Sequence, residues 1–277
     1  MQNTQNTIRR IHSIQPYLVL KTDSFCQHLL SSYGISHFYS FSTGCGADTA
    51  VSLVPDGCSN ILFAYGKDSM TADVYGSTVD KQEITFSPCT DYFGIRFFAG
   101  ENPCFENFPV KELVNCSTSL RDFPDMAHMF TRMSGEETFN GRMSTFLDEY
   151  GKYVENRNRT QHDLFRQICA VIAEKDGLLT IGELEILTGY SARYINYIFE
   201  SESGMSAKQY SRILKLQNVI SCMNTGTVGN ISKVAEDYHF YDQSHFIHDF
   251  ERFTGEVPKQ YLNEVIRRQY RRCVTDV

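Results

Sequence analysis

An internal repeat in the C-terminal third of the chain restricts the possible folds more than any other feature, because two similar segments should fold alike. Residues 180–210 and 230–261 share apolar, glycine and tyrosine positions. The pairs at an offset of 50 are Ile181 with Ile231, Leu184 with Val234 and Tyr190 with Phe240. The pairs at an offset of 51 are Ile195 with Phe246, Phe199 with Phe250, Gly204 with Gly255 and Tyr210 with Tyr261. The second copy therefore has one extra residue in its turn.

Each copy has the signals of two short helices joined by a tight turn. Good N-cap residues precede the expected helices: Thr180 and Ser191 in the first copy, Asn230 and Asp242 in the second. Glu183 could complete a capping box with Thr180. The second helix of each copy has an apolar stripe, formed by Ile195, Ile198 and Phe199 or by Phe246, Ile247 and Phe250. Gly204 and Gly255 then stop these helices.

This arrangement is typical of helix-turn-helix units, here expected at 180–204 and 230–255. Ala235 is the small residue that lets the first helix cross the second, and Glu185 occupies the matching place in the first copy. A helical repeat that only packs against itself is the alternative. It would explain the apolar stripes, but it would not explain the shared caps or the repeated Lys-Gln-Tyr at 208–210 and 259–261.

A helix expected from Met205 to Met223 connects the two units. At ~1.5 Å per residue it would be roughly 28 Å long. That length is close to the ~34 Å of one DNA turn. The connection could therefore hold two recognition helices in successive major grooves on one side of a duplex.

The stretch VAEDYHFYDQSHFIHDFERFTGEVPKQYL, Val234 to Leu262, is similar to the AraC/XylS family of transcription regulators. Its closing signature is carried by Phe250, Gly255, Pro258 and Tyr261, and the resemblance extends over about 164–270. The segments VPDGCSNILF and FGIRFFAGENPCFENFPVKEL resemble a sensor domain of some family members. The resemblance implies a transcription regulator, expected to be an activator, whose partners are double-stranded DNA and RNA polymerase.

Four positions depart from the family pattern. The family usually has basic residues at the places of Tyr197, His248, Glu251 and Leu262. These departures remove charge that would contact phosphates or bases, so we expect a modest DNA affinity or an unusual operator.

The N-terminal outer residues of a recognition helix face the bases. The base-reading candidates are Arg193, Tyr194, Asn196, Tyr197, Gln243, Ser244, His245 and His248. Arg193 could pair with guanine, and Asn196 or Gln243 with adenine. The candidates for phosphate contacts are Ser191, Lys208, Arg212, Lys233, Arg252 and Lys259, with Lys215 nearby.

The N-terminal part has the pattern of short strands separated by turns. The strand-like stretches are SHFYSFS, NILFAYG, ADVYGS, EITFSP and YFGIRFF, between about 35 and 98. From about 110 to 154 the pattern becomes helical. We expect an α+β chain: a small β-barrel or cupin-like sensor and dimerisation domain at 1–155, and an all-α DNA-binding domain at 160–277. The polar stretch Asn156–Arg159 would link them.

Charge and cysteine content limit the functional class only weakly. The net charge of −7 argues against nucleic acid, but residues 160–277 hold 13 basic and 15 acidic residues, and only one face must be positive. The nine cysteines form no Cys-x-x-Cys pair, which fits unpaired thiols in a reducing cytoplasm. We find no signal peptide and no apolar run that could cross a membrane, so we expect a cytoplasmic protein without membrane contact.

Other chemistry has less support. A barrel enzyme would need a cluster of metal ligands, and His37 has no partner histidine on the strands; we expect no catalytic residue, no metal and no cofactor. His245 and His248, with His239 nearby, are read as exposed residues of a recognition helix. Free thiols at Cys58 and Cys89 would be core residues rather than a redox pair.

Arg96 lies in an otherwise apolar strand. It either points outward, which we favour, or anchors an anionic effector inside the barrel. Two functions thus remain open: a regulator controlled by a small molecule, and one whose N-terminal domain only dimerises or docks on a partner.

Overall fold

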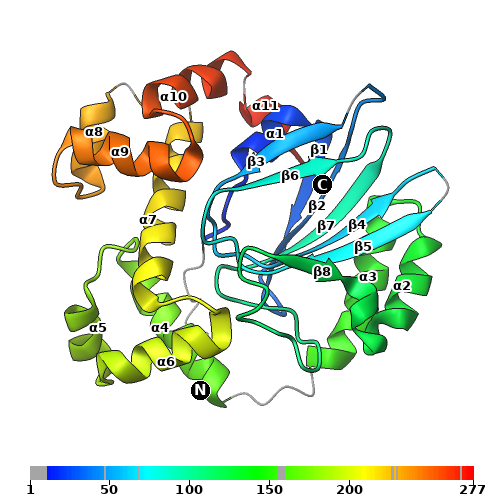
Figure 1. The fold of residues 1–277 in the computed structure, drawn as a ribbon, viewed down its shortest axis with the longest axis horizontal. Coiled ribbons are helices and arrows are strands. Elements are labelled where there is room, and N and C mark those ends of the chain that lie inside the picture. Colours follow the sequence, from blue (N-terminus) through cyan, green and yellow to red (C-terminus); the bar gives the residue numbers. More distant parts are fainter. Residues whose placement is uncertain are drawn as a thin grey trace, which may run out of the picture.

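The computed structural model describes residues 11–46, 48–67, 69–154, 160–225, 228, 230–268 and 270–277. A β-rich N-terminal part is followed by a helical C-terminal part, so the α+β expectation is confirmed (Figure 1). The helical part lies along one side of the sheets, with α7 (Ala207–Asn224) running between an upper and a lower group of helices.

The N-terminal part contains a large and a small sheet. The large sheet has the order β8-β5-β4-β7-β2-β1-β9. Its strands are β1 (Asp23–Leu29), β2 (Ile35–Ser42), β4 (Asn60–Tyr65), β5 (Met70–Tyr75), β7 (Asp91–Phe97), β8 (Ser117–Ser119) and β9 (Thr275–Asp276). All its pairs are antiparallel except β1 with β9. The small sheet pairs β3 (Thr49–Leu53) with β6 (Gln82–Phe86).

Both faces of the large sheet are covered. One face packs on α2 (Ala127–Ser134) and α3 (Phe139–Val154), where Phe38 lies 5.8 Å from Phe146 between ring centroids. The other face meets β3–β6 and α1 (Pro16–Lys21), where the ring centroids of Phe41 and Phe86 are 5.0 Å apart. The alternating side chains of the central strands therefore build two cores, one on each face.

The five expected strands are present, as β2, β4, β5, β6 and β7. The sequence analysis missed β1, β3, β8 and β9. These four are short or polar, and β1 and β9 gain their pairing only from distant segments. The helical pattern expected from 110 begins later, because residues 110–115 form turns and β8 follows them.

The helical part contains α4 to α10 and a one-turn helix. Their bounds are α4 (Thr160–Glu174), α5 (Ile181–Thr188), α6 (Ala192–Ser203), α7, α8 (Ile231–Asp237), α9 (Gln243–Thr254), α10 (Pro258–Arg267) and α11 (Tyr270–Cys273). The connecting helix begins at Ala207 and not at Met205, because Ser206 forms a capping box with Gln209. The expected linker at 156–159 lies outside the described residues.

Local signals set both helix-turn-helix units. Thr180 forms the expected capping box with Glu183, and the other expected N-caps accept backbone hydrogen bonds as well. Gly204 and Gly255 adopt the left-handed conformation at φ 72° and 82°. The turns differ: Gly189 ends α5 at φ 73°, whereas the second copy uses His239 at φ 51°. Glu185, which departs from the small residue of the second copy, accepts a hydrogen bond of 2.6 Å from the N–H of Ala192 at the start of α6.

The two parts share buried contacts. Gln217 of α7 is 1% exposed; its Oε1 accepts from the N–H of Ile14 at 2.7 Å, and its Nε2 donates to the carbonyl of Pro55 at 2.9 Å. His162 of α4 lies 3.0 Å from a carboxylate oxygen of Glu101 and 3.0 Å from one of Glu202. The helical part is therefore docked on the sheets by polar as well as apolar contacts.

Candidate nucleic-acid interface and ligand cavity

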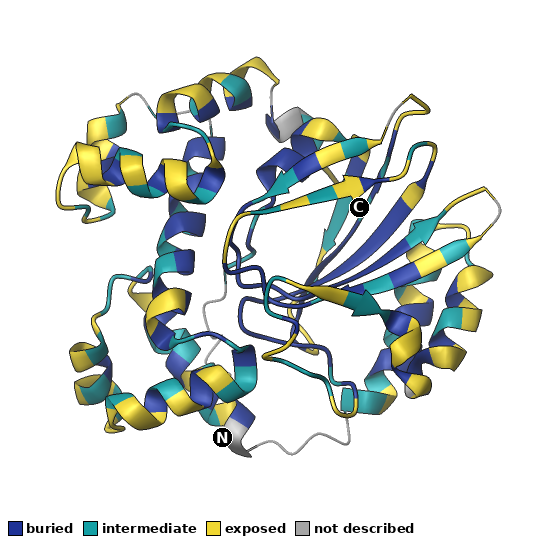
Figure 2. Ribbon diagram, viewed as in Figure 1, coloured by how far each residue is buried: buried dark blue, intermediate teal, exposed yellow. Residues whose placement is uncertain are grey.

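The outer sides of α6 and α9 are exposed (Figure 2). In α6, Arg193, Tyr194 and Tyr197 are exposed, whereas Ile195 and Phe199 are buried. In α9 the exposed candidates are Gln243, Ser244, His245 and His248. Seven of the eight base-reading candidates thus lie on the solvent side of their helices, and Asn196 is half-buried.

An aromatic stripe follows each turn. Tyr190, Tyr194 and Tyr197 are all exposed, and successive ring centroids are 5.4 Å and 6.3 Å apart. At the offset of 51 the second copy has Tyr241, His245 and His248, and Tyr241 is 94% exposed. The sequence analysis missed Tyr190 and Tyr241 as candidates, because it paired Tyr190 with Phe240. Each unit therefore presents a ring, Tyr197 or His248, at a position where the family usually has a basic residue.

Two amide candidates have internal partners. The Oδ1 of Asn196 accepts from the N–H of Ala207 at 3.3 Å, which satisfies the start of α7. A two-bond contact with adenine needs that oxygen, so Asn196 cannot make it in this conformation. The Oε1 of Gln243 accepts from the hydroxyl of Ser232 on α8 at 2.7 Å. This bond orients Gln243 while its amide N–H groups stay on the exposed side.

The phosphate candidates differ in their exposure and in their contacts within the protein. Ser191, Lys208, Lys233, Arg252 and Lys259 are exposed. Arg212 lies 3.8 Å from Asp249 and its guanidinium lies over the ring of Phe253 at 5.2 Å. Lys215 is half-buried, donates to the carbonyl of His239 at 3.2 Å and has its pKa lowered by desolvation.

A groove of about 310 Å³ separates α7 from α9. Lys208, Arg212 and Lys215 line its α7 side, and phenylalanine rings line its floor. His245 lies at its edge, 3.8 Å from Asp249. The described residues contain no group of three or more histidine, cysteine or acidic side chains arranged to hold a metal ion.

The N-terminal part holds a larger cavity of about 430 Å³. It lies on the small-sheet side of β1, β2 and β7, and Figure 1 shows α1 and α11 close to β1. Its lining is formed by His12, Ser13, Ile14, Gln15, Leu18, Val19, Phe25, Gln27, Leu29, His37, Tyr39, Arg96, Tyr270, Val274 and Asp276. The last three come from the C-terminal segment after α10, so segments far apart in the chain form the walls.

Arg96 is 4% exposed and lines this cavity, which makes the outward orientation wrong. Its NH1 lies 3.1 Å from Asp56 Oδ2, and its Nε donates to the Oδ1 of Asn60 at 2.9 Å. The alternation of β7 puts Arg96 on the face that meets the small sheet, whereas Ile95 and Phe97 face the helices. The sequence offered no sign of this, because Asp56 lies 40 residues earlier in the chain.

Asp56 connects the cavity to α7. Its Oδ2 also accepts from Gln15 Nε2 at 2.7 Å, and its Oδ1 accepts from the N–H of Cys58 at 2.9 Å. Gln15 bonds both the N–H and the carbonyl of Val54, and the next carbonyl, of Pro55, accepts from Gln217. A continuous set of hydrogen bonds therefore leads from Arg96 to the helix that joins the two helix-turn-helix units.

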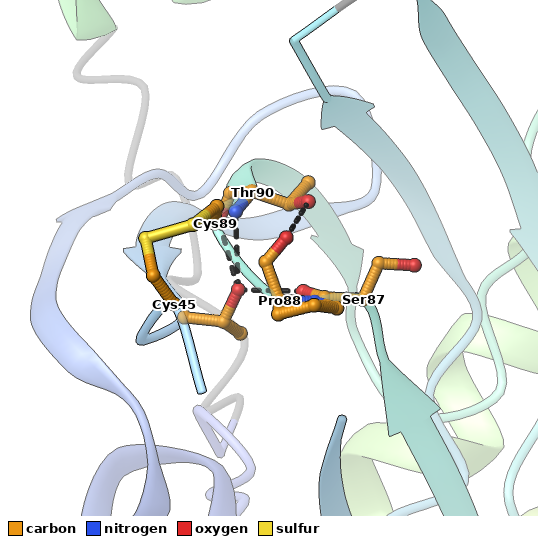
Figure 3. The surroundings of a disulfide bond; sticks show 6 residues. Cys45, Ser87, Pro88, Cys89 and Thr90 are labelled. Atoms are coloured by element: carbon orange, nitrogen blue, oxygen red, sulfur yellow. Dashed lines mark hydrogen bonds between the residues drawn. A yellow bond between two sulfur atoms is a disulfide. The ribbon is translucent and has the colours of Figure 1, made fainter. Parts of the chain in front are cut away.

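The structure pairs two cysteines that the sequence analysis left unpaired. Cys45 and Cys89 form a disulfide that joins the loop after β2 to the turn between β6 and β7 (Figure 3). Their Cα atoms are 4.5 Å apart, and both residues are exposed. The expectation that Cys89 is a core thiol is wrong, because it sits in a turn at φ 50°. Cys58 is buried in a core, as expected.

Comparisons with known proteins match both parts of the chain. A helix-turn-helix domain model matches residues 187–264, and a model described as a domain of unknown function (DUF6597) matches residues 28–119. The XylDLEGF operon transcriptional activator of Pseudomonas putida is 28% identical over 88 residues, which are 31% of this chain and 27% of that protein. The match therefore spans about a quarter of that relative.

Solved structures of ToxT from Vibrio cholerae are also similar. One has a TM-score of 0.44 at 12% identity and covers 82% of this chain and 97% of ToxT. Another, of ToxT with a bound unsaturated fatty acid, has a TM-score of 0.39 at 14% identity and covers 86% and 92% of the two chains. No helix among the described residues is long and apolar enough to cross a membrane.

The environment of His37 predicts a pH dependence of stability. Burial lowers the pKa of His37 well below its usual value, and Arg96 and His12 act in the same direction. Below pH ~6.5 the unfolded chain therefore binds a proton that the folded chain does not, and this residue should lower the free energy of unfolding by up to ~1.4 kcal/mol per pH unit. Urea unfolding between pH 7.5 and 5.5 measures this. The variant His37→Gln should show a shallower loss, and parallel curves for the two proteins would contradict the assignment.

Proposed function

We propose that this chain is a transcription regulator of the AraC/XylS family, that it binds a specific DNA site with both helix-turn-helix units, and that a small molecule in the N-terminal cavity modulates this binding. Its role is regulatory rather than enzymatic, and it acts where DNA is, in the cytoplasm. The proposal divides the chain into a sensor domain before residue 155 and a DNA-binding domain after residue 160.

The observation that carries the DNA-binding proposal is the pair of exposed helices held by one buried helix. Tyr210, Ile213, Leu214, Leu216, Val219 and Ile220 of α7 are all buried. α6 and α9 each follow a turn that contains a residue with positive φ, and each begins at an N-cap residue whose side chain accepts a backbone hydrogen bond. Exposed polar and aromatic residues at these starts have no role in the cores, whereas they suit the major groove.

The cavity favours control by a small molecule over a purely structural N-terminal domain. A domain used only for dimerisation or docking needs no internal space, and a volume of about 430 Å³ is in the range of ligand sites. Its walls include Tyr270 and Val274 from the segment after α10, and its Arg96 is linked through Asp56 to α7. A bound molecule would therefore touch both domains.

Activation is part of this proposal, and it implies contact with RNA polymerase. A homodimer formed through the N-terminal domain would let two copies occupy adjacent sites.

The test begins with selection of preferred duplexes from a random pool. Run-off transcription then measures the sign of regulation, and sedimentation measures the oligomeric state; selection without enrichment of any sequence would refute specific binding.

Removal of a phosphate contact should weaken binding to every DNA. We expect Lys208→Ala and Lys259→Ala each to weaken binding to the selected duplex and to random DNA alike, and to reduce the salt slope by about one unit. Titration of both duplexes over a range of salt concentrations measures this. Lys67→Ala, a change of equal charge in the β4–β5 turn, is the control. A loss confined to the selected duplex would assign these lysines to base reading.

Removal of a base contact should affect only the selected duplex. Arg193→Ala should cost about 1–3 kcal/mol there and little on random DNA, because a two-bond contact is lost with one base only. Gln243→Ala should act in the same direction through the hydrogen bond that its amide N–H groups would donate to a base, since its Oε1 is bound by Ser232. Paired titrations at fixed salt measure the difference, and Arg121→Ala in the N-terminal part is the matched control. Equal losses on both duplexes would show that these side chains only position the protein.

The aromatic stripes predict contact with thymine methyl groups. Replacing contacted thymines in the selected duplex by uracil should weaken binding by roughly 0.5–1 kcal/mol per methyl group, since buried apolar area is lost. Tyr197→Ala and His248→Ala should each lose sensitivity to uracil at their own half of the site. Binding that is equally tight to both duplexes would exclude this mode of reading.

A further inference from the structure

We infer that the cavity bounded by β1, β2, β7 and the segment after α10 takes an uncharged, amphipathic ligand with an aromatic or aliphatic body, and that it rejects anions. The inference deepens the proposed function, because it rests on the cavity being a ligand site. It reverses the expectation that Arg96 anchors an anionic effector.

The charge of Arg96 is already compensated inside the protein. Asp56 is fully buried and lies 3.1 Å from the guanidinium. Burial raises the pKa of Asp56, whereas Arg96, the N–H of Cys58 and the amide of Gln15 stabilise its carboxylate form. Arginine stays protonated in proteins, so the pair is an ion pair with no net charge. An anionic ligand would have to compete with a carboxylate that already holds the guanidinium.

Among the described residues, the other titratable groups of the lining supply no positive charge. Burial lowers the pKa values of both His12 and His37, so both rings are neutral near pH 7. His12 and His37 each lie within 3.0 Å of the hydroxyl of Ser36. Asp276 adds an acidic group at the mouth, where Gln27 donates to it at 2.9 Å. An anion would thus lose its hydration without gaining a free cation, which is unfavourable in a buried site.

The lining of the cavity combines apolar and polar groups. Leu18, Val19, Phe25 and Tyr270 are its apolar members, and the first three are at most 6% exposed. Gln15, His37 and Arg96 are among its polar members. A ligand with an apolar body and an uncharged polar end, such as a hydroxyl or carbonyl group, matches both kinds of group. A cation would likewise lose its hydration there, because the carboxylate of Asp56 is already paired with Arg96.

Two fluorescent dyes of the same ring system test the charge preference. N-phenyl-1-naphthylamine is uncharged, and 1-anilinonaphthalene-8-sulfonate carries one negative charge. All titrations use the full chain with Lys208→Ala, Arg212→Ala and Lys215→Ala, which remove the three cations that line the groove between α7 and α9. Leu29→Trp, which enlarges a side chain of the lining, should weaken the signal that belongs to this site.

We expect the uncharged dye to bind at least about 10-fold more tightly than the sulfonate. Asp56→Asn frees the charge of Arg96 and should shift this ratio by about 10-fold or more toward the sulfonate. If that variant does not fold, the double variant Arg96→Gln with Asp56→Asn gives a second readout: it removes both charges of the pair and should leave the preference for the uncharged dye unchanged.

Tighter binding of the sulfonate to the parent protein, with loss of that binding when Arg96→Gln and Asp56→Asn are combined, would overturn the inference in favour of an anion site. The inference would also be overturned if neither dye gave a fluorescence signal that Leu29→Trp weakens. These outcomes are independent of DNA. Failure of the DNA-binding proposal would appear instead as a selection without enrichment, while the dye preference stayed unchanged.

Discussion

The buried ion pair of Arg96 and Asp56 is the interaction on which the arrangement of the two parts depends. It fixes the loop from Val54 to Cys58 against β7, and this loop offers its carbonyls to Gln15 and Gln217. Loss of one partner would leave a buried charge unpaired, which costs about 3–5 kcal/mol in other proteins. The same pair also neutralises the cavity. One interaction thus sets the packing of α7, the position of the N-terminal segment and the ligand chemistry.

The helical part depends on the sheets for its order. α7 alone could not fix the spacing of α6 and α9, because a helix of 18 residues gains most of its stability from packing. Each helix-turn-helix unit shares a core with the N-terminal part: Phe246 and Phe250 lie in one with Phe41, and Ile195 lies in another with Ala99. A change at the sheets can therefore alter the recognition helices through apolar contacts as well as through Gln217.

The recognition surface combines few charges with many rings. Tyr190, Tyr194 and Tyr197 form one stripe, and the repeat places Tyr241 and two histidines in the other. Phosphate contacts add affinity without sequence preference, whereas contacts with base edges add preference. Under the proposed function, a nearly neutral helical part with aromatic stripes would hence bind weakly to random DNA, and its specificity would come from the hydrogen bonds of Arg193 and Gln243 together with methyl contacts.

The sequence alone determined the parts of the structure that depend on neighbours in the chain. The capping of α5 by Thr180, the ends of α6 and α9 at Gly204 and Gly255, and the main strands follow from contacts within a few residues, which composition and spacing reveal. The family resemblance and the helix-turn-helix repeat followed from the same local signals. The expected start of α7 was two residues early, because Ser206 and Gly204 are both good boundary residues.

Only the tertiary structure decided the features that join distant segments. The inward orientation of Arg96, the disulfide of Cys45 and Cys89 and the pairing of β9 with β1 each join residues that are at least 40 positions apart. The hydrogen bond that Asn196 accepts from the start of α7 likewise depends on how α6 packs against that helix. A strand pattern shows which side chains share a face, but it does not show which face is covered or by what. That choice depends on the topology, because burial of a charge is stable only where the fold brings its partner.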